Sequence, residues 1–161
     1  FGLCLGLQCA VIEYARSILG LRNAHTTECD PDTPHPVVRC LPGQEGVLEL
    51  GGTMRLGSFP CRVDHGSIAE AAYQTDVIHE RHRHRFEINT AYKDMLEAKG
   101  LVVSGMSLDG RHIEIMELKD HPWFLGTQFH PEFKSRPNRP HPLFSEFVQA
   151  ILKYAGFNQE I

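Results

Sequence analysis

Apolar residues near the beginning of the chain recur every three or four positions, which is the spacing of one face of an α-helix. Gly20 follows the last of them directly, and glycine is a frequent helix stop. The pattern therefore predicts an amphipathic helix that begins just after Cys4 and ends near Gly20. Its apolar positions are Leu7, Ala10, Val11, Tyr14, Ala15, Ile18 and Leu19.

The middle of the chain has the patterns of loops and strands. Residues 30–52 are rich in proline and glycine, so we expect mostly loop there, with one short strand around residues 37–38. Residues 53–63 and 101–106 resemble strands in composition. Residues 113–118 alternate apolar with charged side chains, which predicts a strand with one face exposed to solvent.

Two further helices are predicted in the second half of the chain. Asn89 or Thr90 is placed to cap a helix that ends at Gly100, and residues 142–154 follow the pattern of a closing helix. Strands and helices together indicate an α/β domain. The apolar positions of these helices are Ala91, Met95, Leu96 and Ala98 in the first, and Leu143, Phe144, Phe147, Val148 and Ile151 in the second.

Composition limits the class of protein. The chain has 161 residues, 42% of them hydrophobic, which is enough to bury a core as one domain. Its formal net charge of −4 gives no basic field for nucleic acid. No apolar run approaches the roughly 20 residues of a membrane span, and the first residues lack the segments of a signal peptide. We therefore expect a soluble, cytoplasmic protein that binds neither nucleic acid nor membrane.

The cysteines indicate reduced thiols. There are five of them, an odd number, without paired Cys-x-x-Cys spacing or the density of a disulfide scaffold. A free cysteine is most often a small buried hydrophobic residue, and this is our interpretation of Cys9, Cys40 and Cys61.

Cys4 differs from these because it lies between Gly2 and Gly6 at the head of the first predicted helix. A nucleophile on a sharp strand-to-helix turn needs backbone space on both sides, which glycine provides. A helix N-terminus and a neighbouring imidazole lower the pKa of a cysteine thiol, so we expect a reactive thiolate. The amide of Leu5 is placed to donate to a tetrahedral oxyanion, and a second donor is expected upstream of Cys4.

The segment His130-Pro131-Glu132 supplies a base and its partner. The residues on either side of the proline can point the same way, so that Glu132 fixes the tautomer of His130 and His130 takes the proton of Cys4. Such a triplet alone is weak evidence. Together with the elbow at Cys4, it predicts a Cys-His-Glu triad.

The densest charge run of the sequence is residues 80–85, Glu-Arg-His-Arg-His-Arg. It is too short for a nucleic-acid patch, and His82 and His84 lack the further ligands that zinc needs. Our interpretation is that one arginine faces the carboxylate of a ligand, since this contact suits an amino-acid substrate. The ammonium group of such a substrate needs an acidic partner, for which Glu28 is a candidate, although a solvated glutamate is the simpler interpretation.

Four motifs give the chain a specific resemblance. It resembles the class I glutamine amidotransferases and, within them, the glutaminase domains of the CTP synthase family, from residue 1 to about residue 147. Two residue groups depart from the family pattern, Leu7 in place of methionine and residues 24–29, and neither removes a charged or nucleophilic group. The matching motifs are Gly2-Leu3-Cys4-Leu5-Gly6-Leu7-Gln8, the seven residues 51–57, the eight residues 80–87 and the six residues 128–133.

The resemblance implies the fold and the roles of the site residues. It implies a flavodoxin-like α/β fold with a central, mostly parallel sheet, flanking helices and a smaller antiparallel part. It also implies that glutamine is hydrolysed to glutamate and ammonia through a glutamyl thioester, without a metal or cofactor in this domain. The implied roles are Cys4 as nucleophile, His130 as base and Glu132 as its partner, with Leu5, Gln8, Glu28 and Arg85 contacting L-glutamine.

The family also implies partners outside the chain. Its synthetase domain uses ATP and Mg²⁺ to aminate UTP to CTP with the released ammonia, GTP is an allosteric activator, and the full-length enzymes are homotetramers. Because the sequence lacks an initiator methionine and a strand before the elbow, we expect residues 1–161 to be a single glutaminase domain fragment that begins at the elbow. It would be truncated on its N-terminal side, without the synthetase domain and the glycine-rich oxyanion loop.

Two alternatives stay open at this point. One is a glutaminase of another biosynthetic synthetase, or a γ-glutamyl peptidase, with the same fold. The motifs at residues 51–57 and 80–87 argue against it. The other is an inactive regulatory or interaction fragment, either because the oxyanion loop is missing or because a partner must order the site.

Overall fold

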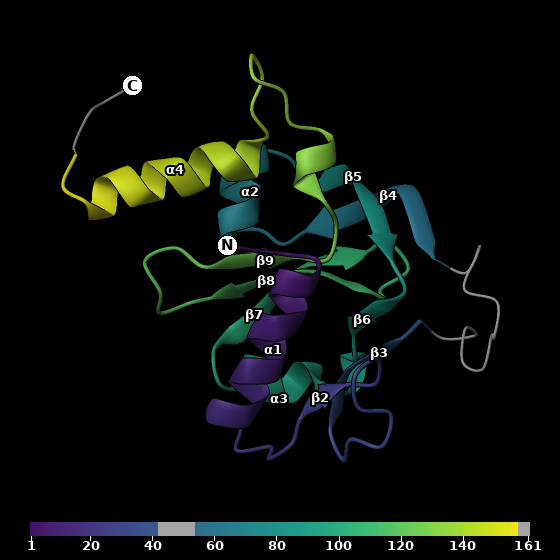
Figure 1. Ribbon diagram of the computed structural model, residues 1–161. Coiled ribbons are helices and arrows are strands. Elements are labelled where there is room, and N and C mark those ends of the chain that lie inside the picture. Colours follow the sequence, from purple (N-terminus) through teal and green to yellow (C-terminus); the bar gives the residue numbers. More distant parts are fainter. Residues whose placement is uncertain (42–53, 158–161) are drawn as a thin grey trace.

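A six-stranded sheet forms the centre of the computed structural model, which describes residues 1–41 and 54–157 (Figure 1). Its first two neighbours, β1 and β9, run parallel, and every other neighbouring pair in this sheet is antiparallel. In spatial order the strands are β1 (Gly2–Leu3), β9 (Leu125–Thr127), β8 (Ile113–Leu118), β7 (Leu101–Ser107), β4 (Arg55–Val63) and β5 (Val77–His84).

The expected α/β class is confirmed, but in the described residues the sheet is mixed rather than mostly parallel. The reason lies in the connections. Strands β7 and β8 are joined by residues 108–112 alone, and so short a link permits only an antiparallel pair. Gly110 in this turn has φ +69°, a conformation that favours glycine.

A second sheet of three short strands lies beside the first (Figure 1). It consists of β2 (His25–Thr26), β3 (Pro36–Cys40) and β6 (Phe86–Ile88). Strand β3 confirms the strand expected around residues 37–38, whereas β2 was not predicted. The rest of the expected loop from residue 42 on, and the start of the strand expected from residue 53, lie outside the described residues. Only Arg85 separates β5 from β6, so the chain passes there from one sheet to the other.

Helices cover both faces of the large sheet (Figure 1). Helix α1 (Leu5–Ser17) packs against one face, where its buried side chains Leu7, Val11 and Ala15 join those of β3, β7 and β8 in one core cluster. Helices α2 (Ile68–Tyr73) and α4 (Pro142–Tyr154) pack on the other face over a second cluster. The remaining helical pieces are η1 (Thr90–Tyr92), α3 (Lys93–Glu97) and η2 (Pro131–Phe133).

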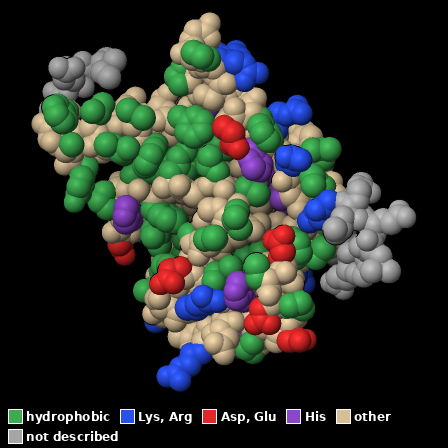
Figure 2. All heavy atoms as spheres, in the orientation of Figure 1, with side chains coloured by type: hydrophobic (Ala, Val, Ile, Leu, Met, Phe, Trp, Pro, Cys, Tyr) green, Lys and Arg blue, Asp and Glu red, His purple; other side chains and the backbone are tan. Residues whose placement is uncertain are grey.

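The predicted helices are confirmed with small differences. Helix α4 has the predicted bounds. Asn89 caps the other predicted helix, the one expected to end at Gly100, by accepting a hydrogen bond from the Ala91 amide. That helix consists of the short pieces η1 and α3. The apolar face of α4 is less buried than its pattern suggests, because Val148 and Ile151 are about half exposed, and Figure 2 shows hydrophobic side chains along this helix.

Strand β8 corrects the prediction of a half-exposed strand. It lies between β7 and β9 and is covered on both faces, so its charged residues are buried as well. Glu114 is fully buried and forms an ion pair with Arg55, with 2.6 Å between Oε1 and Nη1. Glu117 accepts hydrogen bonds from the amides of Ile68 and Ala69 at the start of α2, each 2.9 Å long. The alternation of apolar and charged residues does not indicate solvent exposure in β8, because each carboxylate has a polar partner inside the protein.

All five cysteines are free thiols, as expected. Cys61 is buried, but the interpretation of Cys9 as a buried residue is wrong, since it lies on the exposed face of α1, and Cys40 is only partly buried. Among the described residues, no helix is long and apolar enough to cross a membrane.

Candidate functional site

Cys4 forms the sharp turn between β1 and α1. Its backbone has φ 49° and ψ −101°, a positive φ that is uncommon for a residue other than glycine and is typical of strained functional turns. The turn is held by a 2.6 Å hydrogen bond from the Cys4 amide to the Thr127 carbonyl. The structure therefore contains the elbow that the glycine spacing predicted.

The pairing of β1 with β9 brings the second half of the site to this elbow. Leu3 pairs with Thr127 in parallel register, so Cys4 and Gln128 both follow the carboxyl ends of adjacent strands. Open α/β sheets bind their ligands at this end of parallel strands. Two segments more than 120 positions apart in the sequence thus lie side by side.

His130 and Glu132 are paired as predicted. His130 Nδ1 lies 2.6 Å from Glu132 Oε1, so the ring donates from Nδ1 and keeps the lone pair on Nε2. Among the described residues, the buried Nε2 has no hydrogen-bond partner. The His130 amide donates to the Arg81 carbonyl at 2.8 Å, and the ring stacks on Phe133 with 4.9 Å between centroids. The imidazole is therefore fixed with a free acceptor nitrogen.

The thiol of Cys4 differs from the expected thiolate. Burial raises its pKa, while hydrogen bonds from the Leu5 amide and from Gln128 act in the opposite direction. The negative charges of Glu132 and Glu28 raise the pKa further. The expectation of a lowered pKa is wrong for this arrangement because desolvation outweighs the helix N-terminus. A base must therefore remove the proton when the sulfur attacks.

Gln8 and Arg85 lie close to the elbow. The buried side chain of Gln8 donates to the Phe86 carbonyl at 2.8 Å, which joins α1 to the junction of β5 and β6. Arg85 directly precedes Phe86 and so lies at the same junction. Glu28 is exposed in the turn after β2. Leu5, the first residue of α1, is 60% exposed.

Residues 80–84 of the charge run belong to strand β5, which has two different faces, and none of the sequence interpretations captured this. Its arginines Arg81 and Arg83 point outwards, whereas Glu80, His82 and His84 are buried. Along β5 the arginines alternate strictly with glutamate and histidine, and this alternation could have revealed the two faces of the strand.

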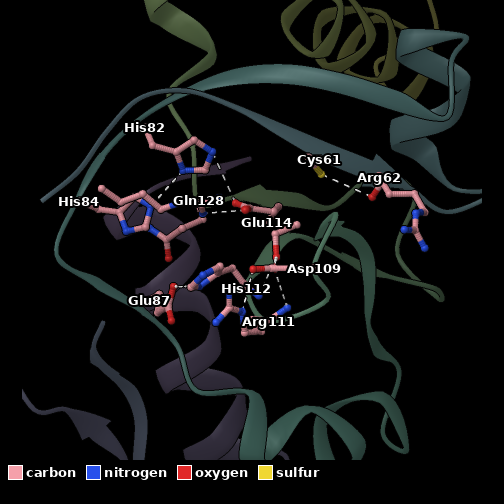
Figure 3. Close-up of polar contacts among 12 residues, drawn as sticks. Cys61, Arg62, His82, His84, Glu87, Asp109, Arg111, His112, Glu114 and Gln128 are labelled. Carbon is pink, nitrogen blue, oxygen red and sulfur yellow. Dashed lines mark hydrogen bonds and ion pairs between the residues drawn. The ribbon is translucent and has the colours of Figure 1, made fainter. Parts of the chain in front are cut away.

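The two buried histidines contact each other, as Figure 3 shows, with 3.0 Å between His82 Nδ1 and His84 Nε2. Burial, followed by the positive charge of Arg55, lowers the pKa of His82 to about 2 and that of His84 to about 3. Both rings are therefore neutral. No group of three or more metal-ligating side chains is found within residues 1–41 and 54–157.

A network centred on the buried carboxylate of Glu80 holds the turn that carries Glu132. Lys134, just after η2, donates to the His79 carbonyl at 2.6 Å and to Glu80 at 3.0 Å. Glu80 also contacts His141 at 3.0 Å and Tyr73 at 3.0 Å. These contacts fasten the turn to β5 and to the start of α4, so they keep Glu132 in place beside His130.

The two glycines of the elbow have different surroundings. A Cβ atom at Gly2 would lie 2.8–2.9 Å from backbone atoms of Gly6 and Leu7, whereas one at Gly6 would meet nothing within 4 Å. We expect Gly2→Ala to lower the free energy of unfolding by about 1–3 kcal/mol, because the first turn of α1 must move. Gly6→Ala should raise it by up to about 1 kcal/mol, since alanine favours a helix. Thermal unfolding of both variants checks this, and equal effects would contradict the crowding at Gly2.

The fold and the elbow together define an amidotransferase of the class I type. The profile described as Glutamine amidotransferase class-I matches residues 1–150, and the chain belongs to this family.

Two curated relatives of this chain belong to one enzyme of the family, CTP synthase. The enzyme of Caldanaerobacter subterraneus subsp. tengcongensis is 57% identical over 99% of this chain and 30% of its own length. The CTP synthase of Thermomicrobium roseum is 63% identical over 91% of this chain and 26% of its own length. The chain therefore spans less than a third of the length of these relatives. The resemblance expected from the motifs is confirmed.

Solved structures agree with this assignment. The glutaminase domain of Trypanosoma brucei CTPS with bound acivicin is 33% identical, with a TM-score of 0.86 over 99% of this chain and 61% of that chain. A putative GMP synthase protein from Thermoplasma acidophilum matches with a TM-score of 0.60 at 17% identity, over 99% of this chain and 60% of that chain. The second likeness concerns the fold alone.

Proposed function

We propose that this chain is the glutaminase domain of a CTP synthase, with Cys4, His130 and Glu132 as its catalytic triad. The observation that supports the proposal is the pairing of β1 with β9, which brings Cys4 and Gln128 to the ends of adjacent strands, with Gln128 two positions before a His130 that is paired with Glu132 and whose Nε2 is free to accept a proton. The sequence identity to CTP synthases supports UTP as the molecule that receives the ammonia.

The reaction begins when Cys4 Sγ attacks the side-chain carbonyl carbon of glutamine and His130 Nε2 takes the thiol proton. Within the described residues the two side chains are not hydrogen-bonded to each other, so they must close on each other for this transfer. Negative charge develops on the carbonyl oxygen, to which the Leu5 amide donates. Glu132 stabilises the imidazolium that forms.

The tetrahedral intermediate then collapses. The carbon–nitrogen bond breaks, His130 returns its proton to the leaving nitrogen, and ammonia departs from a glutamyl thioester on Cys4. Water attacks the thioester, again with His130 as base, and the carbon–sulfur bond breaks. The products are glutamate and the thiol of Cys4, so the cycle needs no metal or redox group.

The substrate contacts are part of the proposal. Arg85 binds the α-carboxylate of glutamine, because a guanidinium suits a carboxylate and keeps its charge at every relevant pH. Glu28 binds the α-ammonium group, and its electrostatic effect on Cys4 supports its position near the reacting sulfur. Gln8 and the backbone of Leu5 complete the contacts at the head of α1.

The remaining partners lie outside the chain. The full-length enzyme is proposed to pass ammonia to its own synthetase domain, which uses ATP and Mg²⁺ to aminate UTP, with GTP as the activator. A cytoplasmic homotetramer is the proposed form. The length of the curated relatives supports a further domain of this kind.

Product analysis of the full-length enzyme tests the proposed function. We expect CTP to form from UTP and ATP with glutamine as nitrogen source, and about one glutamate to appear for each CTP. γ-Glutamyl peptides should be poor donors, because the amino acid or peptide that leaves with its amine is larger than ammonia. Glutamine hydrolysis without CTP formation would favour another synthetase, and faster cleavage of γ-glutamyl peptides would favour a peptidase.

A further inference from the structure

We propose that Gln128 is a further catalytic residue, whose side-chain amide donates a hydrogen bond to Cys4 Sγ and stabilises the sulfur once it has lost its proton. Gln8 is the positioning residue that sets the orientation of this amide. The inference rests on the proposed role of Cys4 as nucleophile. It concerns a residue that the sequence analysis assigned no role, although it lies two positions before His130.

The contact itself is direct. Gln128 Nε2 lies 3.5 Å from Cys4 Sγ, a distance within the range of hydrogen bonds to sulfur. Gln128 is fully buried, and its backbone amide donates to the Glu114 carbonyl at 2.8 Å. Figure 3 shows Gln128 among the buried side chains of Glu114, His82 and His84. Its side chain is therefore held in place on a strand end rather than on a mobile surface.

The direction of the hydrogen bond follows from the Phe86 carbonyl. A backbone carbonyl can only accept, so the Gln8 atom that lies 2.8 Å from it must be the NH₂ group. The same NH₂ lies 3.3 Å from the Gln128 side chain, so the Gln128 atom that faces it must be the acceptor oxygen. The other terminal atom of Gln128, which faces Cys4, is then the NH₂ group. Gln128 can only donate to the sulfur.

A fixed hydrogen-bond donor beside Cys4 Sγ offsets the groups that oppose ionisation of this thiol. Cys4 is partly buried, its own desolvation opposes the charged form, and the carboxylates of Glu132 and Glu28 oppose it as well. A donated hydrogen bond is stronger when its acceptor is ionised, so it favours the thiolate over the thiol. The bond is also present before glutamine binds to the enzyme, because both of its anchors belong to the protein.

The test compares the pH dependence of Cys4 alkylation in the full-length enzyme. Wild type, Gln128→Met and Gln8→Met are treated with iodoacetamide over a range of pH, and the Cys4 peptide is quantified by mass spectrometry. We expect the apparent pKa of Cys4 to rise by about 1 in Gln128→Met, and alkylation at pH 7 to slow about fivefold to tenfold. Gln8→Met should give a smaller rise, because Gln128 loses its anchor but keeps its amide.

Two exposed thiols serve as internal controls. The alkylation profiles of Cys9 and Cys29 should be the same in all three proteins. An unchanged pKa of Cys4 in folded Gln128→Met overturns the inference, and if that variant fails to fold, an unchanged pKa in Gln8→Met overturns it. Glutamine hydrolysis by the wild type is measured separately and tests the proposed function. A raised pKa of Cys4 in Gln128→Met, together with a wild type that hydrolyses no glutamine, contradicts the proposed function while it supports the hydrogen bond from Gln128 to the sulfur.

Discussion

Cys4→Ala abolishes glutamine-dependent CTP formation in the full-length enzyme and leaves ammonia-dependent CTP formation intact; this is the largest effect that we expect. The thiol is the only group of the proposed triad that forms a bond to substrate carbon, and its loss removes the thioester route entirely. We expect glutamine-dependent kcat to fall by at least about 10³-fold. Supplying ammonium salts bypasses the glutaminase step, so the synthetase reaction should proceed at the wild-type rate.

Cys9→Ala is the matched control for this prediction. Cys9 lies on α1, the helix that Cys4 precedes, and its thiol is exposed to solvent. We expect both activities of this variant to equal those of wild type. Loss of ammonia-dependent synthesis in Cys4→Ala would contradict the two-domain scheme, and retention of glutamine-dependent synthesis would contradict the role of Cys4.

Arg55→Met is expected to have the largest effect on stability. The guanidinium of Arg55 lies 2.6 Å from the fully buried carboxylate of Glu114, and its carbon is 4.7 Å from the centre of the Phe59 ring. Methionine fills similar space without the charge. Removal of one partner of a buried ion pair costs about 3–5 kcal/mol, because the other charge stays buried. We expect this loss in the free energy of unfolding at pH 8.

The loss should be smaller at low pH. Burial raises the pKa of Glu114 to about 7, even though Arg55 and His112 lower it, and the charge of Glu87 adds to the rise. A folded-state pKa above the unfolded value means that proton binding stabilises the folded protein below about pH 4.5, and that this contribution is lost as the pH rises through 7. Without Arg55 the pKa of Glu114 rises further, so Glu114 is neutral at pH 5 and needs no cation.

Denaturant unfolding at pH 5 and pH 8 measures this difference. Arg62→Met on the same strand is the control, because its side chain is exposed and a change there should stay within about 0.5 kcal/mol. An Arg55→Met effect that is the same at both pH values would show that the charge of Glu114 does not determine it.

The elements with a regular apolar period could be predicted from sequence. Helix α1 buries side chains at helical spacing, and α4 has the predicted bounds although Leu143 is its one fully buried residue. The elbow at Cys4 follows from its flanking glycines, and the close approach of Gly2 to Gly6 and Leu7 is a local contact. The pairing of His130 with Glu132 is equally local, since two positions separate them. These features depend on neighbours in the sequence and therefore leave a pattern in it.

The features that sequence analysis missed depend on distant partners. Glu114 is buried because Arg55 is beside it, and a pattern of alternating charge cannot reveal that pairing. Along β5 the alternation could have revealed that Glu80 and His82 are buried, but not that their partners are His141 and Glu114. Gln128 carries no charge, and its contact with Cys4 joins residues 124 positions apart. Its donor role became evident only from the geometry.

The most direct test of the central claim is affinity labelling of the full-length enzyme with the diazo-ketone analogue of norleucine, a glutamine mimic that alkylates a reactive cysteine. Peptide mass spectrometry locates the adduct. The proposed function predicts a single adduct on Cys4, which excess glutamine suppresses and which is absent from Cys4→Ala. A full-length enzyme that forms no adduct on Cys4, or one that glutamine does not suppress, would contradict the assignment of Cys4 as the glutaminase nucleophile.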